Sequence, residues 1–284
     1  KIPCVIVHRG LKPYLKHNLE ITSKNNMVYL IGDSSVSKLA SMSDNVEFIH
    51  IEDYESKQKT VKFKEIFLNF STRTADEEWM CFERVFIMQD FLIEKGYKQI
   101  FHLDSDNVLL KNINTFKFEN SNAYCIPSFQ DNFRMDSSIH CGLLNSDFFT
   151  EFEKLYIDIY MTKNGFNLIE EKINYHKKNN VKGGITDMTL YFLLHKLKKI
   201  NPQNLMKPLK SNDGEDFIFI NNFNLAEGFY DLNNFKMSRK KIKLYNGSSV
   251  YDLINSKKIK IVNIHFQGTL KKDLNKYTKY RLRY

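Results

Sequence analysis

The first third of the chain alternates between short β-branched runs and helical stretches, and this alternation restricts the fold more than any other feature. Four apolar runs predict strands, at residues 4–8, 27–31, 46–51 and 99–103. The segments 14–23 and 76–95 predict helices, and Gly96 supplies a C-terminal stop signal for the second. Strands that alternate with helices predict a Rossmann-like α/β fold, with a mostly parallel, twisted central sheet and helices on both faces.

The second half of the chain is less regular. Strands are expected at 123–127, 139–145, 217–220, 242–245 and 259–265. Helices are expected at 147–161 and 185–198. We find no internal repeat and no linker rich in Pro, Gly or Ser, so the sequence predicts one domain over residues 1–284 with an irregular C-terminal half.

Composition places the chain among soluble globular proteins. Hydrophobic residues make up 42% and charged residues 26%, which excludes disordered, collagen-like and coiled-coil proteins. The sequence has no apolar run long enough to span a bilayer and no signal-peptide pattern at Lys1, and a module of a longer protein would fit such a start. Four cysteines without a C-x-x-C pair predict buried, reduced thiols in a cytoplasmic protein.

Net charge narrows the class of partner. The 42 Lys and Arg exceed the 33 Asp and Glu by 9, which favours phosphates, nucleotides, acidic lipid headgroups or nucleic acid. Charge alone does not choose among these. The basic residues gather toward the C-terminus, at 236–243, 257–260, 271–272 and 276–283. A solvated, lysine-coated surface is the simplest interpretation of each cluster.

Asp104-Ser105-Asp106 is the most informative triplet. It ends one apolar strand and is followed at once by the apolar run 108–110, so the two carboxylates are expected at a sheet edge. Side chains at i and i+2 of an extended segment point the same way, so both can converge on one hard cation. Paired Asp residues are also common in surface turns, and the triplet alone does not decide between the two.

A second set of polar residues follows the last apolar strand. The strand delivers the imidazole of His265, then Gly268 and then Lys271. A neutral His can add a nitrogen ligand to a two-carboxylate site, a glycine N–H can bind a phosphate oxygen, and a Lys can neutralise it. A lone His after a strand is more often structural, and the spacing to Gly and Lys favours the phosphate interpretation.

Taken in order, these residues resemble a known enzyme family. Arg84, the Asp104–Asp106 triplet, the segment 183–188 and the ending His265-Phe266-Gln267-Gly268-x-x-Lys271 resemble glycosyltransferases of the A-type fold (GT-A). The ending is similar to that of the retaining family 8 enzymes, which include glycogenin and bacterial lipopolysaccharide galactosyltransferases. The resemblance covers nearly the whole chain. It departs from family 8 at Met188, where Gln is common, and at residues 272–273, where Pro-Trp is usual.

The resemblance implies a metal site and a diphosphate site. Asp104 would contact the metal and the ribose of the donor. Asp106 and His265 would also ligate the metal. Gly268 and Lys271 would hold the diphosphate. Mixed oxygen and nitrogen ligands at a phosphate site suit Mn²⁺ and tolerate Mg²⁺.

The resemblance also implies roles around the donor sugar and the nucleoside. Arg84 would brace the carboxylate pair and the nucleotide. Asp187 would bind sugar hydroxyls or lie near the acceptor, and in an inverting enzyme it is the candidate catalytic base. An N-cap of the helix that follows is the structural alternative for Asp187. His8, Arg9 and Asp33 would line the nucleoside pocket.

Together these observations predict a metal-dependent transferase with a nucleotide-binding half at 1–110 and an acceptor-side half at 111–284. Its donor would be a UDP-sugar and its acceptor a hydroxyl on a glycan or glycolipid. Contact with an acidic membrane through the basic C-terminal third is a further expectation, and nucleic acid is not an expected partner. Two alternatives stay open: a sugar nucleotidyltransferase with a two-Asp Mg²⁺ site, and a basic nucleic-acid-binding module.

Overall fold

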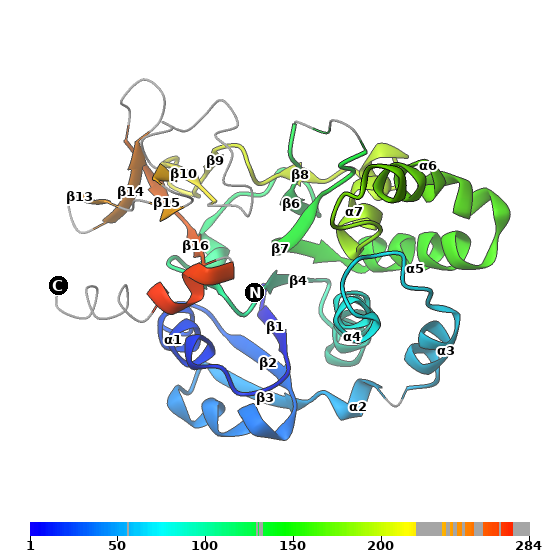
Figure 1. Cartoon of the computed structure of the whole chain (residues 1–284). Coiled ribbons are helices and arrows are strands. Elements are labelled where there is room, and N and C mark those ends of the chain that lie inside the picture. The colour runs from blue at the N-terminus through cyan, green and yellow to red at the C-terminus, as the bar shows by residue number, and fades with distance from the viewer. Residues whose placement is uncertain are drawn as a thin grey trace.

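The fold is seen in a computed structural model (Figure 1), which describes residues 1–55, 57–128, 130, 133–219, 235–236, 239–240, 243–245, 248–252, 258–266 and 268–274. Of the basic clusters, 276–283 lies outside these residues, 236–243 is described only in part, and three of the four residues of 257–260 are described.

A seven-stranded sheet forms the centre of the molecule, in the order β3-β2-β1-β4-β7-β6-β8. Its strands are β1 (Cys4–His8), β2 (Val28–Gly32), β3 (Val46–His50), β4 (Gln99–Leu103), β6 (Ala123–Cys125), β7 (Ser138–Asn145) and β8 (Gln203–Asn204). Four neighbouring pairs are parallel, and β7 runs antiparallel to both β4 and β6. The predicted fold class, an α/β fold with a mostly parallel central sheet, is confirmed.

Helices cover both faces of this sheet (Figure 1). The α-helices are α1 (Pro13–Thr22), α2 (Glu52–Glu55), α3 (Gln58–Ile66), α4 (Ala75–Lys95), α5 (Ser146–Met161), α6 (Lys163–Asn179) and α7 (Asp187–Lys196). Short 3₁₀ helices are η1 (Ser34–Met42), η2 (Ile113–Thr115) and η4 (Gly268–Asp273). None of the helices within the described ranges is long and apolar enough to cross a bilayer.

Alternate residues of β1 show why two helical layers are needed. Val5 packs with Phe82 and Phe86 of α4 in one core, whereas Ile6 packs with Leu15 of α1 in the other. All five side chains are buried. Successive side chains of a strand point to opposite faces, so a strand that is apolar at every position needs cover on both sides.

The later strands form smaller sheets. β13 (Lys243–Tyr245), β14 (Ser248–Asp252), β15 (Lys258–Ile261), β10 (Asp216–Ile218) and β9 (Leu209–Lys210) make a five-stranded sheet in that order. β11 (Phe235–Lys236) pairs with β12 (Arg239–Lys240). β16 (Asn263–His265) pairs with β5 (Asn107–Leu109). The single strand expected over 259–265 is therefore two strands, each with a different partner.

Helix α6 was not expected from the sequence. Its segment is mostly polar, but the buried Ile169 and Ile173 are four residues apart and lie on the face that packs into the core. Thr162 begins the helix by accepting a hydrogen bond from the Gly165 N–H, and Asn180 ends it in the left-handed conformation.

Candidate active site

The Asp104–Asp106 triplet forms a tight turn between β4 and β5. The Asn107 N–H donates to the Asp104 carbonyl oxygen across 2.8 Å, which closes the turn. The Asp104 N–H donates to the carbonyl of His140 on the neighbouring strand β7, also across 2.8 Å. The two carboxylates therefore lie on a turn and not on an extended segment, so the expectation that they point the same way from a strand was wrong. The turn still leaves both at the carboxyl end of β4, where open α/β sheets bind ligands.

The pairing of β16 with β5 places His265 beside this turn. His265 is opposite Asn107 in the register, and the Phe266 N–H donates to the Asp106 carbonyl oxygen across 2.8 Å. His265 Nε2 consequently lies 3.1 Å from Asp106 Oδ1. One ligand atom each from Asp104, Asp106 and His265 lie within 4.8 Å of one another. The structure thus brings together three side chains, of which the first, Asp104, and the last, His265, are 161 positions apart in the sequence.

Lys271 approaches the same carboxylate from η4. Its Nζ lies 3.0 Å from Asp106 Oδ2 and 5.1 Å from the centre of the Tyr14 ring. Burial opposes ionisation of Asp106, but the hydrogen bond and charge of His265 and the Lys271 ammonium outweigh it and hold the pKa of this carboxyl well below its usual range. Gly268 begins η4 with φ +58° and is exposed.

Arg84 connects two of the predicted site residues. A capping box between Thr74 and Glu77 begins helix α4, which carries the guanidinium into the core. Arg84 Nη1 lies 2.6 Å from Asp104 Oδ1 and Nη2 lies 2.7 Å from Asp187 Oδ2. Of the Asp104–Asp106 pair that Arg84 was expected to brace, the guanidinium contacts Asp104, and its second partner is Asp187. Both contacts are charge-assisted hydrogen bonds.

Asp187 is the first residue of α7 and is buried. Thr186 is the N-cap, so the structural alternative that made Asp187 the cap was wrong. Asp187 Oδ2 accepts from the Tyr191 hydroxyl across 3.0 Å as well as from Arg84, and Oδ1 accepts from the Met188 N–H across 2.9 Å. These three hydrogen bonds fix the orientation of the Asp187 carboxylate.

Gly184, the second of two glycines before α7, allows the chain to pass close to another loop. Gly184 has φ +112°, and a Cβ there would lie 2.2 Å from the Phe70 carbonyl oxygen. The Ile185 N–H donates to that same carbonyl across 3.2 Å. A larger residue would separate the loop from α7 and move Asp187 away from Arg84.

His8, Arg9 and Asp33 gather at the carboxyl ends of β1 and β2. His8 Nε2 lies 2.9 Å from the Gly10 carbonyl oxygen, and Arg9 forms ion pairs with two glutamates, Glu55 and Glu83. Asp33 accepts from the Gly10 N–H across 2.5 Å and caps η1. Asp33 therefore fixes the turn after β1, while His8 and Arg9 line the cavity beside it.

This cavity has a volume of about 280 Å³. Its walls come from β1, α1, α4, the Asp104–Asp106 turn and η4: Val7, His8, Arg9, Tyr14, Ile51, Arg73, Glu77, Met80, Cys81, Glu83, Arg84, Ile87, Asp104, Ser105, Asp106 and Lys271. Three of the cations expected at the donor, Arg9, Arg84 and Lys271, are among them. Asp33, Asp187, His265 and Gly268 lie outside this lining.

Sequence reasoning missed Glu78, which lies beside Asp187 in the core. Its side chain is 0% exposed, and it forms a long ion pair with Arg73, whose Nη1 is 3.7 Å away. Burial, together with the charge of Asp187, raises the pKa of Glu78 to about 7. The signal was present in the sequence, because Glu78 precedes the apolar Phe82 and Phe86 by four and eight residues on one helix face.

Burial also limits what Trp79 and the cysteines can do. Trp79 is buried and donates from Nε1 to Glu83 Oε1 across 2.9 Å, so its ring is not an exposed platform on which a sugar could stack. The four cysteines are free, as predicted. Cys4, Cys125 and Cys141 are buried, but Cys81 is only half-buried, so the expectation of a buried thiol was wrong for this residue. His140, the residue before Cys141, places its Nε2 3.5 Å from the Cys141 Sγ.

No family model matches the sequence, and no curated protein does. Solved structures of glycosyltransferases are similar to the fold, at low identity. Mouse xyloside xylosyltransferase 1 is 11% identical, with a TM-score of 0.49, over 72% of this chain and 84% of that one. The PaToxG glycosyltransferase is 11% identical, with a TM-score of 0.42, over 69% of each chain. The glycosyltransferase GlyE of Streptococcus pneumoniae is 16% identical, with a TM-score of 0.39, over 72% of this chain and 46% of that one.

Proposed function

We propose that this protein is a metal-dependent glycosyltransferase that moves a sugar from a nucleotide-linked donor, a UDP-sugar, to an acceptor hydroxyl on a glycan or glycolipid. One observation carries the proposal. Asp104, Asp106 and His265 converge within 4.8 Å, and Lys271 lies next to them on the wall of a cavity of about 280 Å³. Two carboxylates, an imidazole and an ammonium around one hollow form a site for a divalent cation and a diphosphate.

The donor set fits Mn²⁺ and tolerates Mg²⁺. Carboxylate oxygens are hard ligands that suit both ions, and an imidazole nitrogen shifts the preference toward Mn²⁺. Asp104, Asp106 and His265 would hold the ion. When bound, the ion would neutralise charge on the diphosphate and so lower the barrier to cleavage of the sugar–phosphate bond.

Lys271 and Arg84 would assist the cleavage of the sugar–phosphate bond. Glycosyl transfer breaks the bond between the anomeric carbon and a phosphate oxygen and forms one to the acceptor oxygen, so negative charge develops on the departing diphosphate. Lys271 would stabilise that charge from the cavity wall. Arg84 would hold Asp104 in place through its contact at 2.6 Å.

The contacts of Asp187 bear on where the acceptor proton goes. A general base must reach that proton, yet Asp187 is buried and its oxygens accept from Arg84, Tyr191 and a backbone N–H. We infer that Asp187 positions Arg84 at the donor side. The leaving diphosphate would then take the acceptor proton, as retention of configuration requires no separate base.

The test is a screen of nucleotide sugars for Mn²⁺-dependent hydrolysis. The measured quantity is the rate at which nucleoside diphosphate is released. Asp106→Asn removes one carboxylate charge at constant size and should lower the rate about 100-fold or more. Asp213→Asn is the matched control, because Asp213 lies in an exposed turn away from the cavity.

Three results would contradict the proposal. Equal rates for Asp106→Asn and the wild type would remove the site assignment. Release of pyrophosphate instead of nucleoside diphosphate would identify a nucleotidyltransferase. Steeply salt-dependent binding to mixed DNA, without any nucleotide-sugar turnover, would identify a nucleic-acid-binding module.

A further inference from the structure

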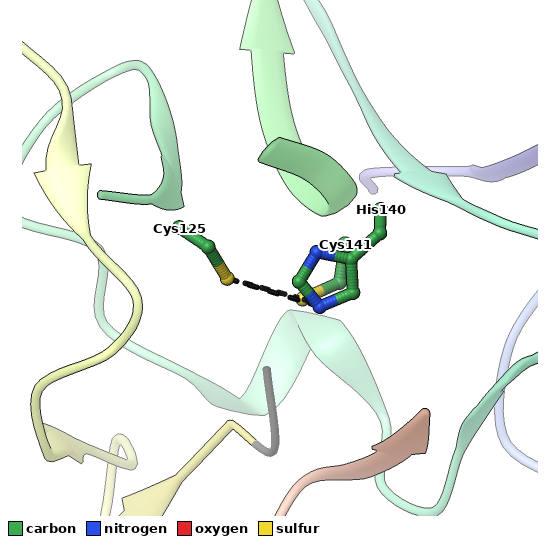
Figure 2. Close-up of side chains that lie close together, drawn as sticks. All are labelled: Cys125, His140 and Cys141. Atoms are coloured by element: carbon green, nitrogen blue, oxygen red, sulfur yellow. Dashed lines mark hydrogen bonds between the residues drawn. The ribbon is translucent and has the colours of Figure 1, made fainter. Parts of the chain in front are cut away.

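A second cluster of ligand-type side chains lies in the core beneath the Asp104–Asp106 turn. It consists of Cys125, at the end of β6, and His140 and Cys141 in the adjacent strand β7. Figure 2 shows the two sulfur atoms and the edge of the imidazole ring converging. All three residues are 0% exposed. Neither the proposed donor site nor its cavity lining includes any of them.

The orientation of His140 is fixed by its other ring nitrogen. Nδ1 lies 3.1 Å from the Ser138 hydroxyl oxygen, so the opposite edge of the ring, with Nε2, faces the sulfurs. The Asn107 side chain donates to the His140 carbonyl oxygen across 3.0 Å. A polar partner on the second nitrogen is the usual arrangement around a metal-binding histidine, because it selects the tautomer and aims the ligand nitrogen.

The spacing of the three ligand atoms is that of one small tetrahedral ion. Cys125 Sγ lies 4.0 Å from Cys141 Sγ, and His140 Nε2 lies 3.9 Å and 3.5 Å from the two sulfurs. Zinc bonds of about 2.3 Å to sulfur and about 2.0 Å to nitrogen, at tetrahedral angles, separate two sulfurs by about 3.8 Å and a sulfur from a nitrogen by about 3.5 Å. Shifts of a few tenths of an ångström would complete the geometry.

Charge and softness also fit a thiophilic divalent ion. Two thiolates and a neutral imidazole around Zn²⁺ have no net charge, so the complex can be buried without an unpaired ion. Thiolate ligands select zinc, whereas the carboxylates of Asp104 and Asp106 suit Mn²⁺ and Mg²⁺. The two clusters should therefore take different metals.

We propose that Cys125, Cys141 and His140 bind one Zn²⁺ ion, with a non-protein ligand in the fourth coordination position. Such an ion would join β6 to β7 directly under the candidate active site. His140 accepts the Asp104 N–H at 2.8 Å, and its ring stacks on that of His265 with 4.7 Å between ring centres. The zinc site would thus position the turn and the imidazole of the other cluster. The inference does not depend on glycosyl transfer.

The test measures metal content in the full chain. The protein is purified under reducing conditions, dialysed against a weak chelator to strip the carboxylate site, and analysed by elemental mass spectrometry. We expect about one zinc per chain in the wild type and in Cys4→Ser, whose thiol is buried in β1 outside the cluster. Cys125→Ser should contain less than a tenth of that amount and unfold at a lower temperature, because an ion bound only to the folded state stabilises it.

Cobalt gives a second readout, whose deciding measurement is made on the wild-type protein. Co²⁺ exchanged into the wild type should produce the near-ultraviolet charge-transfer band of thiolate ligation, and Asp106→Asn should retain this band. Zinc-free wild-type protein with no such band would overturn the proposal, as would equal zinc in Cys125→Ser and the wild type. A mass two hydrogens lower without reductant, mapped to a Cys125–Cys141 disulfide in the freshly purified protein, would also overturn it.

Discussion

Replacing Glu78 by Gln should make the protein more stable at neutral pH and change how its stability depends on pH. The Glu78 side chain is 0% exposed, and its carboxylate oxygens have no hydrogen-bond partner among the residues that the structure describes. Its neighbours are the carboxylate of Asp187 and the guanidinium of Arg73 at 3.7 Å. An uncharged amide of the same size removes the cost of ionising this buried group.

The magnitude follows from the pKa. Burial raises the pKa of Glu78 from 4.5 to about 7, a difference that corresponds to about 3 kcal/mol. Arg73 is 49% exposed, so water screens part of the local field and we expect about 2 kcal/mol. Because the folded state holds the proton more tightly, stability from the protonated carboxyl is fully present below pH 4.5 and is lost as pH rises to about 7.

Urea unfolding of the wild type and Glu78→Gln between pH 4.5 and 8 measures how the stability of each protein depends on pH. The free energy of unfolding of Glu78→Gln minus that of the wild type should increase by about 2 kcal/mol across the range and level off above pH 7. This difference removes the contribution of the other titrating groups, because both proteins contain them. Glu65→Gln, on the exposed side of α3, is the control and should give a flat difference. A flat difference for Glu78→Gln as well would refute the reasoning.

Three further substitutions test other parts of the site. Lys271→Met should weaken binding of UDP with Mn²⁺ about tenfold by calorimetry, because one charge-assisted hydrogen bond is lost. Substitution of its exposed neighbour, Lys272→Met, is the control and should leave the affinity unchanged. Equal affinities of Lys271→Met and the wild type would exclude a role of Lys271 in binding the diphosphate. Arg84→Lys keeps the charge but cannot reach both carboxylates, so unfolding in urea should show a loss of about 2 kcal/mol, and wild-type stability would contradict the bridge. Gly184→Ala should cost more than about 2 kcal/mol by thermal unfolding, because its Cβ meets a carbonyl at 2.2 Å; Gly214→Ala, with φ +87° in open space, should cost only about 1 kcal/mol, and equal losses would disprove the steric argument.

Local sequence predicted the elements of the first half well because each element there has its own pattern. β1 occupies the predicted residues 4–8, and α4 begins within one residue of the predicted 76 and ends at the predicted 95. Gly96 adopts φ +69° after α4, as a helix stop signal requires. These features depend on neighbours in the chain, which the sequence shows directly.

Two side-chain arrangements depended on contacts that local patterns do not contain. The role of Arg84 in the candidate active site is one, since its two partners are 20 and 103 residues away. The Cys125–Cys141 cluster outside that site is another, because it exists only where β6 and β7 pair with a shifted register. The antiparallel direction of β7 also had no local signal, because the apolar pattern of a buried strand is the same whether the strand runs parallel or antiparallel to its neighbour.

The sequence by itself determined the alternation of strands and helices, the burial of three of the four thiols and the residue types suited to a cation and a diphosphate. Tertiary structure alone decided which of these side chains meet. The β5–β16 pairing sets His265 against Asp106, and the burial of Glu78 next to Asp187 changes its acidity. The physical reason is that periodicity and turn propensity act over a few residues, whereas electrostatics and ligand geometry depend on distances in space.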